Sequence, residues 1–167
     1  MEQRYMKVGL ALTVGLLAGL WCINNLLNLE TAWAAVAYTL SQQDQAGYSV
    51  HIIPPIESPI VTTLALAVIC LAEATAASFS ILGAWRMWAA RKSDDAHFAT
   101  ATRPAVMGAG VAVLTWFLGF QVIGGAGIMM GQAEGLLGAT EGAFRFGAYS
   151  FLTLIYLSLA EPSRPGS

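Results

Sequence analysis

The sequence has few charged residues and long stretches without a single base. Asp, Glu, Lys and Arg make up 11% of the 167 residues, whereas 56% are hydrophobic and the mean hydropathy is +0.61. This composition lies outside that of ordinary soluble domains and suits one small membrane domain covering residues 1–167. Because the base-free stretches leave no basic patch, nucleic acid is excluded as a partner.

Residues that usually hold metals or cofactors are also scarce. Cys22 and Cys70 both lie in apolar stretches, which argues against a disulfide framework or a zinc site and favours small buried hydrophobic residues. His51 and His97 lie outside those stretches, so no histidine stands where facing helices would hold a haem. We therefore expect no metal and no cofactor, although a quinone or pigment at an interface stays open.

Catalytic motifs are missing as well. The sequence has no glycine-rich phosphate loop followed by lysine, no HExxH and no nucleophile elbow. We expect the protein not to be an enzyme.

What the sequence does contain is four long apolar runs. They cover about residues 8–29, 58–85, 104–133 and 142–160. A helix rises 1.5 Å per residue and needs about 20 residues to cross a bilayer. The runs predict an all-α fold, a polytopic bundle of four transmembrane helices, with external segments at 30–57 and 134–141 and an internal loop at 86–103.

The bases predict how the chain is threaded. Arg4 and Lys7 precede the first run, four more surround the break between the second and third, and Arg164 follows the fourth. Cytoplasmic loops retain Lys and Arg, so we expect both termini on the cytoplasmic side of the membrane. In the first external segment, apolar residues from Leu29 to Leu40 recur at helical spacing and predict a short amphipathic helix on the outer surface.

Five polar residues within or at the ends of the runs form the candidate site. Counted along their helices, they come to similar depths in the bilayer, and such residues normally face the interior of a bundle. This intramembrane polar layer consists of Glu73, Arg145, Asn24, Asn25 and Gln121.

Arg145 is the one base inside a run, and its partner is open at this point. Glu73 is the economical partner for a buried guanidinium. Glu141, four residues earlier, could form a local helical pair instead, leaving Glu73 protonated or bonded to a threonine. Arg145 could also extend to the outer surface.

Glycines at four-residue spacing, which are Gly15 with Gly19 and Gly127 with Gly131, and the adjacent pair Gly124-Gly125 indicate where helices approach closely. We expect mainly packing within the chain, with contact to another protein as the alternative. The candidate packing glycines are Gly15, Gly19, Gly124, Gly125, Gly127 and Gly131.

Several of these motifs together resemble a known family. They are Asn24-Asn25, Glu73-Ala74, the stretch from Trp116 through Gly124-Gly125 to Gln132, and Glu141-Gly142-Ala143-Phe144-Arg145-Phe146. The chain resembles the bacterial family of predicted small integral membrane proteins, over most of its length. The resemblance implies a four-helix inner-membrane protein and supplies no activity.

Three function classes follow. The leading one is a non-catalytic accessory or structural subunit that packs against a larger membrane complex, of respiratory or photosynthetic type, with the lipid bilayer and other integral membrane subunits as partners. The second is a small transporter or channel, alone or as a homo-oligomer, using the polar layer. The third is a membrane redox or lipid-modifying module.

Overall fold

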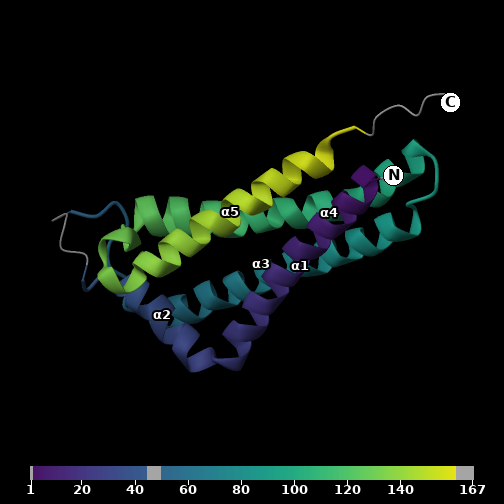
Figure 1. Ribbon diagram of the computed structural model, residues 1–167. Coiled ribbons are helices and arrows are strands. Elements are labelled where there is room, and N and C mark those ends of the chain that lie inside the picture. The colour runs from purple at the N-terminus through teal and green to yellow at the C-terminus, as the bar shows by residue number, and fades with distance from the viewer. Residues whose placement is uncertain (1, 45–49, 161–167) are drawn as a thin grey trace.

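The computed structural model describes residues 2–44 and 50–160, and in these residues the regular structure is entirely helical. Figure 1 shows long helices running roughly side by side, with α2 folded back at one end. The expected all-α membrane fold is confirmed. The elements are α1 (Glu2–Leu27), α2 (Leu29–Ser41), α3 (Pro59–Ala89), α4 (Asp95–Val113), η1 (Leu114–Gly127), η2 (Met130–Gln132), η3 (Glu134–Leu136) and α5 (Leu137–Ser158).

Three of the described helices are long and apolar enough to cross a membrane. They are α1 with 26 residues, α3 with 31, and the continuous helix formed by α4 and η1 with 33. Helix α5 has 22 residues and packs along α4 and η1, but it is not among these three. The fourth span therefore stays a prediction.

The turn between α3 and α4 is much shorter than the sequence suggested. Residues 86–89 and 95–103, expected to be loop, are helical. Helix α4 starts early because the Asp94 side chain accepts a hydrogen bond from the backbone N–H of His97 at 2.7 Å. Pro104, which we expected at a helix start, lies inside α4. The same helix ends at Gly127, short of the expected 133, and short 3₁₀ turns follow.

Helix α2 confirms the short helix expected in the first external segment. It follows α1 after a break at Asn28 and packs against α3. The indole Nε1 of Trp33 donates a hydrogen bond to Thr63 Oγ1 at 3.0 Å. Helix α2 thus closes one side of the space between α1 and α3.

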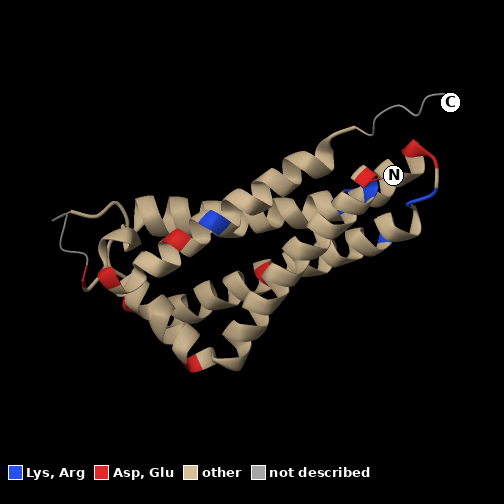
Figure 2. Ribbon diagram, in the orientation of Figure 1, with Lys and Arg blue, Asp and Glu red and all other residues tan. Residues whose placement is uncertain are grey.

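Three segments that were predicted to share one side of the membrane meet at one end of the molecule. Arg4 is 2% exposed and donates hydrogen bonds to the carbonyls of Arg91 and Ser93, at 3.2 and 2.7 Å, and to the Asp95 carboxylate. Lys7 is 3% exposed and donates to the Leu159 carbonyl at 2.6 Å. In Figure 2 most of the blue residues lie at this end. Arg164 lies outside the described residues.

Close helix packing in the same half depends on glycines. A Cβ at Gly83 would collide with the backbone of Ala105, and one at Gly108 with Ser80, so α3 and α4 touch almost backbone to backbone. A Cβ at Gly15 would lie 2.7 Å from Ile81 Cγ1, so α1 also approaches α3 closely, here against a side chain.

The other predicted packing glycines also face this chain. Gly19 lies against Ala77, Gly127 against Ile53 and Gly131 against Thr140. The surroundings of Gly124 and Gly125 are Met130 and the backbone of their own helix. Five of the six thus lie against side chains of this chain, whereas Gly125 has only the backbone of its own helix within 4 Å, and their role in helix packing stays a prediction.

The opposite half of the molecule is open. Helix α3 packs along α4 but makes little contact with η1, and the two diverge toward the end where α2 lies (Figure 1). Residues 114–127 form a π-helix, in which each N–H bonds the carbonyl five residues back, as Ile128 does to Ile123 at 2.8 Å. The site lies in this half.

Candidate intramembrane ligand site

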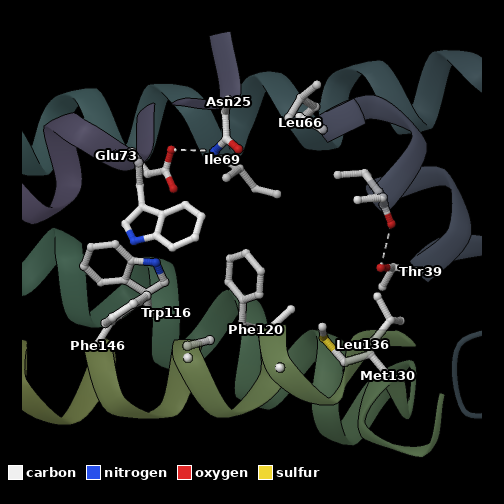
Figure 3. Close-up of a pocket in the computed structure, with 18 residues that line it drawn as sticks. Asn25, Thr39, Leu66, Ile69, Glu73, Trp116, Phe120, Met130, Leu136 and Phe146 are labelled. Carbon is white, nitrogen blue, oxygen red and sulfur yellow. Dashed lines mark hydrogen bonds between the residues drawn. The ribbon is translucent and has the colours of Figure 1, made fainter. Parts of the chain in front are cut away.

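A cavity of about 370 Å³ lies between α1, α2, α3, η1 and α5. Its wall is almost wholly apolar and aromatic, with Asn25, Thr39 and Glu73 as the polar side chains. Figure 3 shows these residues converging on one space, with Glu73, Asn25, Trp116 and Phe146 at one end and Leu66, Thr39, Met130 and Leu136 toward the other.

Glu73 is the only acidic side chain in this wall. It is 2% exposed, and its Oε2 accepts a hydrogen bond from Asn25 Nδ2 at 3.0 Å. Among the described residues it has neither an ion pair nor another hydrogen bond, so Oε1 is left without a protein partner. A carboxyl within membrane helices is costly and commonly marks a functional site.

Aromatic rings stand around this carboxyl. The ring centroid of Phe146 lies 5.7 Å from that of Trp21 and 5.7 Å from that of Trp116. Trp116 is 3% exposed, so it is a core residue. Phe120 projects into the middle of the cavity (Figure 3).

A second cavity of about 480 Å³ adjoins the first, between α3 and η1. Its wall is apolar apart from two threonines. The residues that line both cavities are Val36, Thr39, Ile69, Phe120 and Met130. The two spaces are therefore neighbours separated by side chains and not by backbone.

The predicted polar layer does not form one cluster. Arg145 pairs with Glu141 at 3.0 Å, one helical turn away, and both side chains are exposed, at 62% and 67%. The Glu73–Arg145 pair is thus not formed, because α5 turns Arg145 outward, and the local alternative is the one observed. Gln121 donates through Nε2 to the Thr140 carbonyl at 2.8 Å, and Asn24 is exposed. Of the other four residues in the predicted layer, only Asn25 forms a hydrogen bond with Glu73.

Sequence reasoning missed the apolar part of the site. Trp116, Phe120, Met130 and Phe146 line the cavity, yet in an apolar chain their residue types do not distinguish them from lipid-facing residues. The π-helix decides which side of η1 carries Trp116 and Phe120. Cys22, expected to be a small buried residue, is buried and its Sγ lies 3.4 Å from the Cys70 carbonyl.

Long apolar helices around an intramembrane cavity define an integral membrane protein of the helical class. A family model described as predicted small integral membrane protein, DUF2165, matches residues 3–160, and the chain belongs to this family. Comparisons with curated proteins and with solved structures gave no significant match.

Proposed function

We propose that this protein binds a small hydrophobic molecule inside the membrane and does not transform it chemically. The observation that supports this is Glu73, a nearly fully buried carboxyl held by Asn25 at the wall of an apolar cavity. Ligand sites are typically apolar pockets with a few convergent polar groups, and 370 Å³ lies within their usual size. A carboxyl that served packing alone would be less costly as an apolar residue.

The side chain that is hydrogen-bonded to Glu73 supports binding without catalysis. An acid or base in catalysis works with a second group that exchanges protons or attacks the substrate. The partner here is an amide, which neither gains nor loses a proton near neutral pH. This arrangement suits recognition of a polar group.

The test is to identify molecules that stay bound after extraction in a mild detergent, by mass spectrometry of protein and lipids together. We expect the natural chain and the Glu141→Gln control to retain the same hydrophobic molecule, and Glu73→Leu to lose it while keeping its helical circular dichroism. Identical bound molecules in Glu73→Leu, or none in any variant, would overturn the proposal.

The role in the cell that we propose is that of an accessory subunit in a larger membrane complex of respiratory or photosynthetic type. The support is that the turn between α3 and α4 spans only residues 90–94 and that large apolar side chains cover the outer faces of the helices, so contacts with lipid and with other subunits dominate the surface. Co-purification with other integral membrane proteins at fixed stoichiometry checks this role. A protein that purifies alone and moves its ligand across liposomes would be a transporter instead.

The proposed location is the bacterial inner membrane with both termini cytoplasmic. The meeting of the N-terminal turn, the α3–α4 turn and the end of α5 at one end of the molecule supports a common side for all three. Single cysteines at Ser93 and Asp44, in a chain with Cys22 and Cys70 replaced by serine, test it. A thiol reagent that does not cross membranes should label Asp44→Cys in whole cells and Ser93→Cys only in inverted vesicles; the reverse pattern contradicts the orientation.

A further inference from the structure

We propose that the ligand of this cavity is a lipophilic organic cation whose charge lies between Glu73 and the surrounding aromatic rings and whose apolar chain extends into the second cavity. This inference rests on the proposed ligand-binding function and adds the chemical class of the ligand.

The charge of the ligand follows from what Glu73 lacks. The one base within the apolar runs, Arg145, is committed to Glu141 on the exposed face of α5. Glu73 Oε2 is occupied by the Asn25 amide, which carries no charge, and Oε1 has no partner among the described residues. A cation in the cavity would supply the missing charge, and in a low-dielectric site that attraction is strong.

The aromatic rings select an organic cation over a metal ion. Phe146 contacts both Trp21 and Trp116, and all three line the same cavity as Glu73. The faces of such rings attract cations of diffuse charge that are easily stripped of water. Hard metal ions such as Ca²⁺ and Mg²⁺ take six or more oxygen ligands. The wall offers side-chain oxygens only from Asn25, Thr39 and Glu73, too few to replace a hydration shell.

The position of the second cavity accounts for the apolar chain. It begins beyond Phe120 and Ile69, which line both spaces, and continues between α3 and η1. Aliphatic side chains such as Val68, Leu114 and Leu118 line it and are exposed, so the space opens toward the lipid. At about 480 Å³ it is larger than the space beside Glu73. The smaller, aromatic cavity beside Glu73 matches a compact charged group, and the larger, aliphatic cavity matches a long apolar chain.

Two probes of the same shape and opposite charge test the sign. Tetraphenylphosphonium and tetraphenylborate are titrated separately against the full chain in detergent, and binding is read from tryptophan fluorescence and checked by equilibrium dialysis. We expect the phosphonium to bind at least about tenfold more tightly than the borate in the natural chain and in Glu141→Gln, and this preference to vanish in Glu73→Gln. Equal binding of the two ions to the natural chain, or a preference that survives Glu73→Gln, would overturn the inference.

A series of alkyl-triphenylphosphonium ions tests the place of the chain. Affinity should rise from the methyl to the decyl compound in the natural chain. Ala72→Phe, which adds bulk in the second cavity, should remove most of that rise and leave methyl binding unchanged, while Ala34→Phe, at an exposed position that lines neither cavity, should change neither. An undiminished rise in Ala72→Phe contradicts the proposed path.

The two proposals fail in different ways. Should Glu73→Leu lose a neutral molecule that the natural chain retains, while no phosphonium binds, the ligand-binding function stands and the cation is wrong. Should no hydrophobic molecule be retained and no probe bind, both are wrong.

Discussion

Asn25 Nδ2 donates a hydrogen bond to Glu73 Oε2 at 3.0 Å, joining the end of α1 to the middle of α3. The bond fixes one oxygen of a buried carboxyl and leaves the other facing an apolar cavity. Asn25 is thereby the residue that orients Glu73, and much of what the site can bind depends on this pair.

Asn25→Ala should lower the free energy of unfolding, because it leaves the Glu73 oxygen buried without its donor. We expect a loss of about 1 to 3 kcal/mol. The neighbouring exposed residue provides the control, and Asn24→Ala should change stability by less than about 0.5 kcal/mol. Reversible denaturation in mixed micelles measures both. Equal effects of the two substitutions would mean that the hydrogen bond does not contribute.

Gly83→Ala should destabilise the contact between α3 and α4, because the added Cβ meets the backbone of Ala105, which cannot move like a flexible side chain. We expect the free energy of unfolding to fall by about 1 to 3 kcal/mol or more. At Gly110 a Cβ meets no atom within 4 Å, so Gly110→Ala should stabilise α4 by about 0.5 to 1 kcal/mol through its higher helix propensity. Thermal unfolding followed by circular dichroism measures both, and a tolerated Gly83→Ala contradicts the close packing.

Arg4→Met should weaken the end of the molecule where α1, the α3–α4 turn and the end of α5 meet. The guanidinium donates to the carbonyls of Arg91 and Ser93 and to Asp95, and it lies 4.4 Å from the centre of the Phe98 ring. The Asp95 side chain is 46% exposed, so its pair with Arg4 is not fully buried. We therefore expect the free energy of unfolding to fall by about 1.5 to 3 kcal/mol, the usual contribution of hydrogen bonds to charged groups. Lys92→Met, at an exposed position of the same turn, is the control. Faster proteolysis between α3 and α4 in Arg4→Met alone provides a second measurement.

The phenol of Tyr38 should ionise at a higher pH than that of an ordinary tyrosine. Its hydroxyl donates to Asp44 Oδ2 at 2.6 Å, and this hydrogen bond raises the pKa of Tyr38, with burial and the negative charge of Asp44 adding to it. Because the pKa is raised in the folded state, the hydrogen bond stabilises the fold fully below the usual tyrosine pKa of about 10, and this stabilisation is lost as the pH rises through the raised value.

Ultraviolet titration of the phenolates measures this pKa. The difference between the natural chain and Tyr38→Phe isolates the phenol of Tyr38, and Asp44→Asn should return its titration toward the usual range. A Tyr38 titration that Asp44→Asn leaves unmoved speaks against the hydrogen bond.

The contacts of Arg145 could be predicted from the sequence only in part. The sequence named Glu73 and Glu141 as its possible partners, but residue spacing does not say how a helix is rotated about its axis. The packing of α5 on α4 and η1 turns Arg145 outward, where a pair with Glu141 costs little desolvation. Among the described residues, Glu73 therefore has its hydrogen bond with Asn25 and no ion pair with Arg145.

The stretch from 114 to 127 shows a different limit. Its apolar character predicts a membrane helix, and a helix is present, but as a π-helix whose rotation per residue differs from that of an α-helix. Side chains counted at α-helical spacing are then assigned to the wrong face.

By itself, the sequence determined the class of protein: long apolar runs with few charges must be helices in a bilayer, since only helices satisfy all their backbone hydrogen bonds there. Through the grouping of the bases, it also predicted that the N-terminal residues, the segment between the second and third runs and the end of the fourth run share one side of the membrane. Only the tertiary structure decided which polar residues meet. Helix rotation, the break at Asn28 and the divergence of α3 from η1 depend on side-chain packing between segments far apart in the chain, and these joined Asn25 to Glu73 and opened the cavity beside them.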